Sequence, residues 1–149
     1  MKERFKSYSA VMLMLIRNTE KGEEILFQKR KNTGYCDGQY DVTASGHVEE
    51  GETMTEAMCR EAKEEVSIGI EPEGLEFVCL NHSNYNNGTY YNGYFIARKW
   101  EGMPSIGEPE KIEELKWVNI NQLPENIMED RKIAIENYKN GVKYSETGW

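Results

Sequence analysis

Residues 46 to 68 form a glutamate-rich stretch from which the fold of the whole chain can be predicted. They read GHVEEGETMTEAMCREAKEEVSI, from Gly46 to Ile68. The first seven residues contain two glycines and three glutamates, which is typical of a tight loop. The remainder has the pattern of a helix with one apolar face. The stretch therefore predicts a loop, 45–51, that leads almost directly into a helix.

The start and the orientation of this helix can be read from its residues. Thr53 and Glu56 have the Thr-x-x-Glu spacing of a capping box, so we expect the helix to begin after Thr53 and to reach about Val66. At about 100° per residue, one face collects apolar side chains. That face carries Met58, Cys59, Ala62 and Val66. We expect it to pack on a sheet.

Three carboxylates share a second arc of the same helix, roughly 100° wide. Glu61, Glu64 and Glu65 lie on it, and they repel one another unless a cation is present. Mg²⁺ and Mn²⁺ prefer carboxylate and carbonyl oxygens, so one such ion would remove the repulsion. Taken alone, the helix is more typical of a solvated acidic face, because exposed glutamates are common and Arg60 forms i,i+4 pairs with Glu56 and Glu64. The neighbouring loop distinguishes the two interpretations.

Loop and helix together resemble the Nudix box, residues 46–68 here. That motif is Gly, five residues, Glu, seven residues, Arg-Glu, an aliphatic residue, any residue, Glu-Glu, any residue, Gly and an aliphatic residue. The matching positions are Gly46, Glu52, Arg60, Glu61, Glu64 and Glu65. Six such matches arise by chance with a probability on the order of 10⁻⁵. Ser67 replaces the usual glycine at the helix end, where we expect the turn to shift slightly.

The resemblance implies roles for the matching residues. Glu61 and Glu65 are the best metal ligands, followed by Glu64, and a glutamate of the box or of a loop acts as the base. Arg60 resembles the residue that holds a catalytic glutamate by charge-assisted hydrogen bonds, so the catalytic set is Glu61, Glu64 and Arg60. Glu52 is similar to the first glutamate of the motif, which lies near the metal. The cofactor implied is Mg²⁺, with Mn²⁺ as the alternative.

Further ligands of the metal are expected outside the helix. Ser45 precedes the box, and its backbone carbonyl reaches toward the expected metal. Glu113 or Glu114, before the strand that contains Trp117, resembles an additional acidic ligand of the family. The other interpretation is that both belong to an acidic surface run that begins at Glu108. The sequence favours neither.

Three residues are candidates for contact with substrate. Gly46 supplies a turn that brings backbone close to the site, His47 follows it, and Tyr40 lies beside a predicted loop. Packing is the commoner role of a tyrosine, and a surface position is the commoner one of a histidine. Other tyrosines near predicted loops are Tyr35, Tyr85 and Tyr90.

The whole chain, 1–149, reads as one α+β domain. The resemblance implies a Nudix-type α/β/α sandwich with a mixed, partly antiparallel sheet, and the order of the predicted elements agrees with it. Expected strands are 10–16, 24–29, 40–44, 75–80, 89–98 and 112–120, with a turn at 81–88. A second helix is expected over 131–139, ended by Asn140-Gly141.

Composition limits the partners. A net charge of −8 argues against an extended nucleic-acid surface, while a metal ion would still allow a small anionic substrate. The apolar run 10–16 is far too short for a membrane span, so no membrane partner is expected. Three widely spaced cysteines fit free thiols in a reducing compartment. We therefore expect a cytoplasmic protein, and a homodimer is compatible with the sequence.

The expected activity is Mg²⁺-dependent hydrolysis of a diphosphate linkage in a nucleoside triphosphate or another nucleoside diphosphate derivative, by attack of metal-activated water on phosphorus. Two alternatives stay open. One is a non-catalytic nucleotide sensor of the same fold, although such modules tend to lose the box carboxylates that this chain keeps. The other is a relative of isopentenyl-diphosphate isomerase, which would need a cysteine within 42–47, where this sequence has none.

Overall fold

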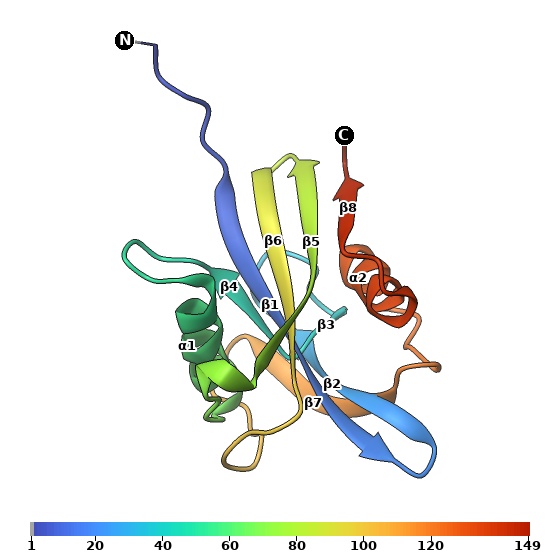
Figure 1. Cartoon of the computed structure of the whole chain (residues 1–149). Coiled ribbons are helices and arrows are strands. Elements are labelled where there is room, and N and C mark those ends of the chain that lie inside the picture. Colours follow the sequence, from blue (N-terminus) through green and yellow to red (C-terminus); the bar gives the residue numbers. More distant parts are fainter. Residues whose placement is uncertain (1) are drawn as a thin grey trace.

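The computed structural model describes residues 2–149, in which a mixed sheet lies between two helices (Figure 1). Helix α1 (Met54–Val66) covers one face and helix α2 (Glu129–Asn140) the other. This arrangement confirms the predicted α/β/α sandwich of the α+β class. The helices have 13 and 12 residues, and no helix within 2–149 is long and apolar enough to cross a membrane.

Eight strands build the sheet, and a single turn of 3-10 helix, η1 (Pro72–Gly74), precedes the fifth. They are β1 (Tyr8–Thr19), β2 (Gly22–Arg30), β3 (Tyr40–Asp41), β4 (Ala44–His47), β5 (Leu75–Tyr85), β6 (Gly88–Ala97), β7 (Ile112–Asn119) and β8 (Tyr144–Thr147). The order is β3-β2-β1-β6-β5-β8, with β4 also paired to β1 and β7 to β2. The β1–β6 and β5–β8 pairs are parallel and the others antiparallel, so the sheet is mixed.

The long strand β1 separates the two halves of the core. Its side chains alternate between the faces of the sheet, as a strand with period two requires. Val11, Leu13 and Leu15 join the cluster under α1, which includes Ala57, Met58, Ala62 and Val66. Met12, Met14 and Ile16 join the cluster under α2, which includes Ala134 and Ile135. Because both faces are covered, the strand reads as a continuous apolar run.

The ends of α1 follow the predicted pattern, with one difference. Both bonds of the capping box are present: Glu56 N donates to Thr53 Oγ1 (3.1 Å), and Thr53 N donates to Glu56 Oε1 (3.0 Å). At the other end, Ser67 adopts the left-handed conformation (φ 59°) and its N–H reaches Lys63 O. The expectation of a shifted turn was therefore wrong, since serine takes the conformation that glycine usually supplies at this place.

Several strand boundaries differ from the predictions. The single strand expected over 40–44 is two short strands, so β4 extends into the expected loop. The turn expected at 81–88 is limited to two residues, because β5 continues to Tyr85 and β6 begins at Gly88. Strand β8 was not predicted, since four mostly polar residues beside β5 carry little periodicity. Helix α2 ends at Asn140 with Gly141 left-handed (φ 69°), as expected.

A buried ion cluster connects the sheet to α2. Asp41, fully buried on β3, accepts hydrogen bonds from Arg131 Nε (2.7 Å) and Arg30 Nη1 (3.2 Å). Arg131 Nη1 also donates to Tyr94 Oη (3.1 Å) on β6. Burial alone would raise the pKa of Asp41, but the charge and hydrogen bond of Arg131 outweigh it, so the pKa is lowered. Asp41 therefore stays ionised at neutral pH.

Replacing Asp41 by asparagine should destabilise the fold by about 3–5 kcal/mol at pH 7, because Arg131 then stays buried without its counter-charge. A carboxyl with a lowered folded-state pKa contributes stability above its unfolded pKa and loses it as the pH falls through the folded value. Urea unfolding should therefore show the gap between wild type and variant closing in acid. The exposed Glu125→Gln is the control, and an equal loss there would contradict the assignment.

Candidate active site

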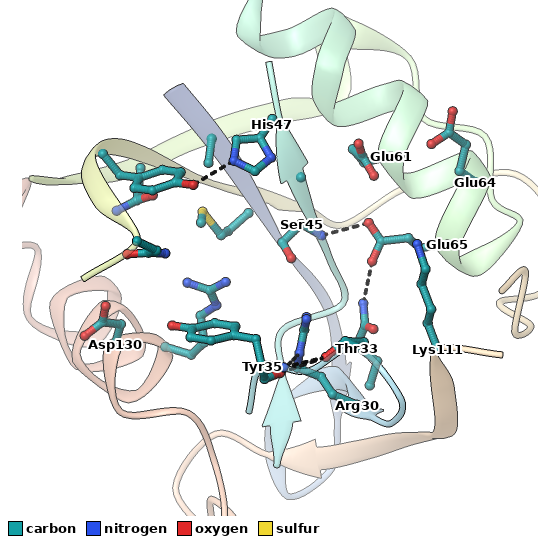
Figure 2. Close-up of a pocket in the computed structure, with 18 of the residues that line it drawn as sticks. Arg30, Thr33, Tyr35, Ser45, His47, Glu61, Glu64, Glu65, Lys111 and Asp130 are labelled. Atoms are coloured by element: carbon teal, nitrogen blue, oxygen red, sulfur yellow. Dashed lines mark hydrogen bonds between the residues drawn. The ribbon is translucent and has the colours of Figure 1, made fainter. Parts of the chain in front are cut away.

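A cavity of about 500 Å³ opens between α1, β4 and the beginning of α2 (Figure 2). Glu61, Glu64 and Glu65 of α1 form one wall, next to Ser45, Gly46 and His47 of β4. Arg60 also lines it. The structure thus brings together seven of the residues that the sequence singled out.

Arg60 connects the loop and the helix of the predicted box. Its guanidinium donates to both carboxylate oxygens of Glu52 (2.7 and 3.1 Å), to Glu61 Oε1 (2.7 Å) and, more weakly, to Glu64 Oε2 (3.4 Å). Its Nη2 also donates to the backbone carbonyl of His47 (3.1 Å). The pair with Glu52 is bidentate, which a planar fork of donors makes geometrically specific. One side chain therefore positions two carboxylates and the backbone of β4.

The same contacts set the protonation of the pair. The hydrogen bond from Arg60 is the main reason why the pKa of Glu52 is lowered, and the bond from Glu49 N adds to it. The bond to Glu52 in turn raises the pKa of Arg60. Both groups stay charged at neutral pH. Glu52 itself is not part of the cavity lining within residues 2–149, so it acts on the cavity through Arg60.

Glu65 is the buried carboxyl of the cavity, with 7% of its surface exposed. Gln28 Nε2 donates to its Oε1 (2.8 Å), and the backbone N–H of Ser45 donates to its Oε2 (3.2 Å). Burial, first, and a hydrogen bond with Glu61, second, raise its pKa well above the ordinary value. Glu65 thus lies in a place where a nearby cation would be strongly favourable.

Gly46 allows Glu61 to lie against the backbone of β4. A Cβ at this position would overlap the Glu61 carboxylate. Its φ lies outside the left-handed region, so the requirement is space and not backbone conformation. The sequence had suggested a close approach of backbone at Gly46, and the contact that requires it is with Glu61.

Glu64 and His47 differ from their neighbours in how strongly they are held. About half of the Glu64 side chain is exposed, and 3.4 Å separates it from Arg60. His47 Nε2 shares a hydrogen bond with Tyr90 Oη (2.9 Å), and its ring lies 5.4 Å from that of Tyr90. Of the three α1 carboxylates on the cavity wall, Glu64 is therefore the one whose side chain is held least firmly. His47 belongs to an aromatic edge of the cavity.

The structure places three of the candidate residues elsewhere. Tyr40 is buried in the core under α2, and its hydroxyl donates to Glu114 Oε1 (3.0 Å). Glu113 pairs with Lys29 (3.4 Å) on the surface. The lining of the cavity, taken over residues 2–149, includes none of the three. A metal bound at the α1 wall would therefore find neither Glu113 nor Glu114 beside it.

Glu108, which the sequence interpretation had assigned to an acidic surface run, lines the cavity together with Lys111. The loop that carries it is fixed on the end of α1, where Ser105 N donates to Val66 O (3.0 Å) and Gly107 N to Glu65 O (2.8 Å). A Cβ at Gly107 would overlap the backbone carbonyl of Glu64. The one sequence signal for a close contact at this loop was the glycine of the Gly107-Glu108 pair. A loop glycine does not indicate which helix it contacts, so the place of Glu108 in the cavity could not be predicted.

Basic and aromatic side chains complete the cavity. Arg30 and Arg131, both bonded to Asp41, line it, and neither was a candidate from sequence. Tyr35, Tyr85 and Asp130 lie at the end away from the α1 glutamates, as Figure 2 shows for Tyr35 and Asp130. Cationic groups near a carboxylate wall fit a phosphate group that is itself bridged to the carboxylates by a metal.

The comparison with protein families agrees with this site. Residues 7–138 match the family described as the NUDIX domain, and the box lies within that span. The chain belongs to the Nudix family. The resemblance stated for residues 46–68 is thereby confirmed.

Two curated relatives and one solved structure show how close the likeness is. The chain is 25% identical over 122 residues to the NAD-capped RNA hydrolase NudC of Stutzerimonas stutzeri and 28% identical over 123 residues to the human 8-oxo-dGDP phosphatase NUDT18. These matches cover 82% and 81% of this chain but only 40% and 36% of the relatives. A MutT Nudix hydrolase from Burkholderia pseudomallei shares the fold, with a TM-score of 0.77 and 24% identity over 89% of this chain and 98% of that one.

Nudix hydrolases generally use divalent metal ions, and the oxygen donors on this wall suit Mg²⁺ or Mn²⁺. The observation that favours a cation here is geometric: the buried Glu65 and the largely buried Glu61 line one cavity together with Glu64. Within residues 2–149 no three acidic, histidine or cysteine side chains already point at one common position. Glu61 points toward Arg60, and Glu65 toward Gln28 and Ser45. The carboxylates of this wall would therefore have to approach one another to hold an ion together.

In this Nudix domain, Gly46→Ala should lower activity at least about tenfold while stability changes by less than ~1 kcal/mol, because the new methyl group displaces the end of the Glu61 side chain and not backbone atoms. Steady-state rates and urea unfolding measure the two effects. Gly74→Ala is the control, since a Cβ there meets nothing within 4 Å. An active Gly46→Ala would show that the position of Glu61 over β4 does not matter.

Proposed function

We propose that this protein hydrolyses a diphosphate linkage in a nucleoside diphosphate derivative with the help of a divalent metal ion. The observation that carries the proposal is the wall of Glu61, Glu64 and Glu65 in a cavity that also contains Arg30 and Lys111. Carboxylates and cations in one cavity suit a ligand that is anionic and bound through metal. When bound, Mg²⁺ or Mn²⁺ would supply positive charge against the phosphate oxygens.

The contacts that hold each residue of the box suggest which role it has. Arg60, bonded to Glu52, fixes the position of Glu61. Gln28 and the backbone of β4 fix Glu65. We assign Glu61 and Glu65 as metal ligands, with the Ser45 carbonyl and Glu64 as further oxygen donors. Glu108 replaces Glu113 and Glu114 as the proposed acidic ligand from outside the box, because it lines the cavity.

Glu64 is our choice for the general base. Among Glu61, Glu64 and Glu65 it has the most exposed side chain, and its contact with Arg60 is longer than that of Glu61, so it can accept a proton without losing a strong bond. In the proposed step, the oxygen of a water molecule forms a bond to one phosphorus while the bond to the bridging oxygen breaks. Glu64 takes the proton, and the bridging oxygen leaves with the second phosphate.

Basic side chains would hold the phosphates in line. Arg30 and Arg131 are neutralised only in part, since they share the single carboxylate of Asp41. Lys111 lies on the loop that carries Glu108. Fixed cations at these places bind phosphate oxygens in the substrate and stay in position as charge moves to the leaving group. Orientation of this kind supplies a large part of catalysis in phosphoryl transfer.

A small nucleotide is the proposed substrate class. The names of both curated relatives refer to nucleotides, and a net charge of −8 disfavours an extended nucleic-acid surface. The cysteines are free thiols, which supports a cytoplasmic location. A non-catalytic sensor would not need the Arg60 contacts that position Glu61. An isomerase of the related branch would need a cysteine within 42–47, where this sequence has none, and Cys36 lines a different cavity.

Glu64→Gln and Glu65→Gln should each lower kcat at least about 100-fold, because a lost carboxylate weakens charge stabilisation or proton transfer. Phosphate release from a nucleotide panel in Mg²⁺ and Mn²⁺, with and without chelator, measures it. Calorimetric titration of the metal should show weaker binding for Glu65→Gln. The exposed Glu73→Gln is the control. Near-normal rates for both variants, with the fold intact, would sink the metal-site assignment.

Arg60→Lys should lose most of kcat with a modest change in metal affinity. One ammonium group cannot reproduce the bidentate contact with Glu52 together with the bonds to Glu61 and to the β4 backbone. Rates and metal titrations measured side by side separate positioning from ligation. Arg17→Lys, which keeps a surface pair with Glu24, is the matched control. A fully active Arg60→Lys would mean that Arg60 is only a surface charge.

A further inference from the structure

The part of the cavity that lies over β1, β5 and β6 differs from its walls. Six carboxylates and four lysine or arginine side chains line the cavity over residues 2–149, and none of them belongs to these three strands. The strands contribute uncharged side chains, which we call the floor: Ala10, Met12, Ser83, Tyr85, Tyr90 and Asn92. The floor therefore suits an uncharged part of a ligand whose charged part lies between the walls.

Asn92 is the amide of this floor, and its side chain is held from behind. Its Nδ2 donates to Asn81 Oδ1 (3.3 Å) and to Ser83 Oγ (3.1 Å), which uses both amide protons. Asn92 is buried, with 6% of its surface exposed. Among residues 2–149, the only sealed side-chain polar atom without a partner is Asn137 Nδ2. Asn92 Oδ1, to which none of these residues donates, is therefore open to the cavity.

Asn81 connects Asn92 to the edge of the sheet. Ala10, Asn92, Asn81 and Ser145 are successive cross-strand partners, so their side chains share one face of the sheet. Asn81 Nδ2 donates to Ser145 Oγ (3.0 Å), and Thr147 Oγ1 donates to Asn81 Oδ1 (3.3 Å). A chain of side-chain hydrogen bonds thus runs from the cavity to β8. We call it the amide relay.

The two amides of the relay can turn over together without losing a hydrogen bond. A half-turn of an amide exchanges its oxygen and its nitrogen, and a hydroxyl group either donates or accepts. After such a turn, Asn81 Nδ2 donates to Asn92 Oδ1, and Ser83 Oγ donates to the same oxygen. Ser145 then donates to Asn81, and Thr147 accepts from it. Asn92 now presents Nδ2 to the cavity in place of Oδ1.

A planar heterocycle with a polar edge fits the surroundings of Asn92. Ala10 and Met12 offer apolar surface next to the amide, and Tyr90 offers an aromatic ring. The bases of nucleotides differ mainly in their edge groups. Adenine and cytosine carry an amino group where hypoxanthine and uracil carry a keto oxygen. One fixed amide atom would pair with only one of these two groups, whereas the relay can offer either partner.

We propose that Asn92 recognises the hydrogen-bonding edge of the base of the substrate, and that the coupled turn of Asn81 and Asn92 lets one site accept amino and keto bases alike. This inference rests on the proposed function and narrows it to a hydrolase with little preference between such bases. An amino group donates to Asn92 Oδ1, and a keto oxygen accepts from Nδ2 in the turned state. Asn81 acts only through Asn92, so it is a positioning residue.

The test fixes the relay in one orientation with Asn81→Asp. The new carboxylate can only accept, and it takes hydrogen bonds from Asn92 Nδ2 and from the hydroxyls of Ser145 and Thr147. Asn92 Oδ1 then stays toward the cavity and favours amino bases. Calorimetry at pH 8 should give Kd values for ADP and inosine diphosphate within threefold of each other in wild type. In Asn81→Asp, ADP should bind at least tenfold more tightly, and CDP against UDP should behave in the same way.

Two further variants separate recognition from a structural role. Asn84→Asp adds the same charge to β5 outside the relay and should leave both ratios unchanged. Asn92→Leu keeps the size of the side chain but removes both orientations. It should raise Kd for all four nucleotides at least fivefold, while inorganic triphosphate, which has no base, should inhibit as strongly as in wild type. Equal weakening of triphosphate would mean that Asn92 only supports the sheet.

Turnover is measured beside binding, so the two hypotheses fail separately. A wild type that prefers one edge by tenfold or more, or ratios that stay unchanged in Asn81→Asp, would overturn the turning relay while hydrolysis stands. If none of the four nucleotides binds to wild type, recognition of a base by Asn92 is wrong. If they bind with the expected ratios but no product is released from them or from the wider panel, the proposed hydrolase function fails and the relay stands.

Discussion

The active-site wall depends on one guanidinium. Three carboxylates on one arc of α1 repel one another, and a fourth, Glu52, lies in the loop before the helix. The guanidinium of Arg60 offsets this repulsion. It donates hydrogen bonds to Glu52, Glu61, Glu64 and the carbonyl of His47. The same contacts tie the loop to the helix and to β4. Charged hydrogen bonds therefore hold the side chains of the site in position before any ligand binds, and hydrophobic packing holds only the helix and sheet beneath them.

Two buried carboxyls show how differently the fold treats negative charge. Asp41 lies between two arginines, and despite complete burial its pKa is lowered. Glu65 accepts hydrogen bonds from the neutral N–H groups of Gln28 and Ser45, while burial and, second, a hydrogen bond with Glu61 raise its pKa. The first charge is balanced within the protein and serves the fold. The second has two neutral donors beside it, and this asymmetry supports our proposal of a cation next to Glu65.

The sequence predicted the site better than its surroundings, for a physical reason. Fixed spacing on one helix determines which side chains share an arc, so the wall of Glu61, Glu64 and Glu65 and the cap at Thr53 could be read directly. Residues that reach the cavity from distant elements could not. Arg131 arrives from α2, and Glu108 from a loop fixed by backbone bonds. Glu113 and Glu114 were the candidates from sequence, but they lie outside the cavity lining, where Glu113 pairs with Lys29 and Glu114 accepts from Tyr40.

Two glycines allow the chain to approach this wall closely. Gly46 gives space to the Glu61 carboxylate, and Gly107 gives space to the carbonyl of Glu64. Neither has a left-handed φ, so what both positions require is the absence of a side chain. Helix α1 is thereby contacted from two sides by backbone, and backbone contact tolerates changes in the neighbouring side chains. A structure with 24% identity shares this fold over 89% of the chain, as expected where contacts made by the backbone, which every residue type supplies, hold the elements together.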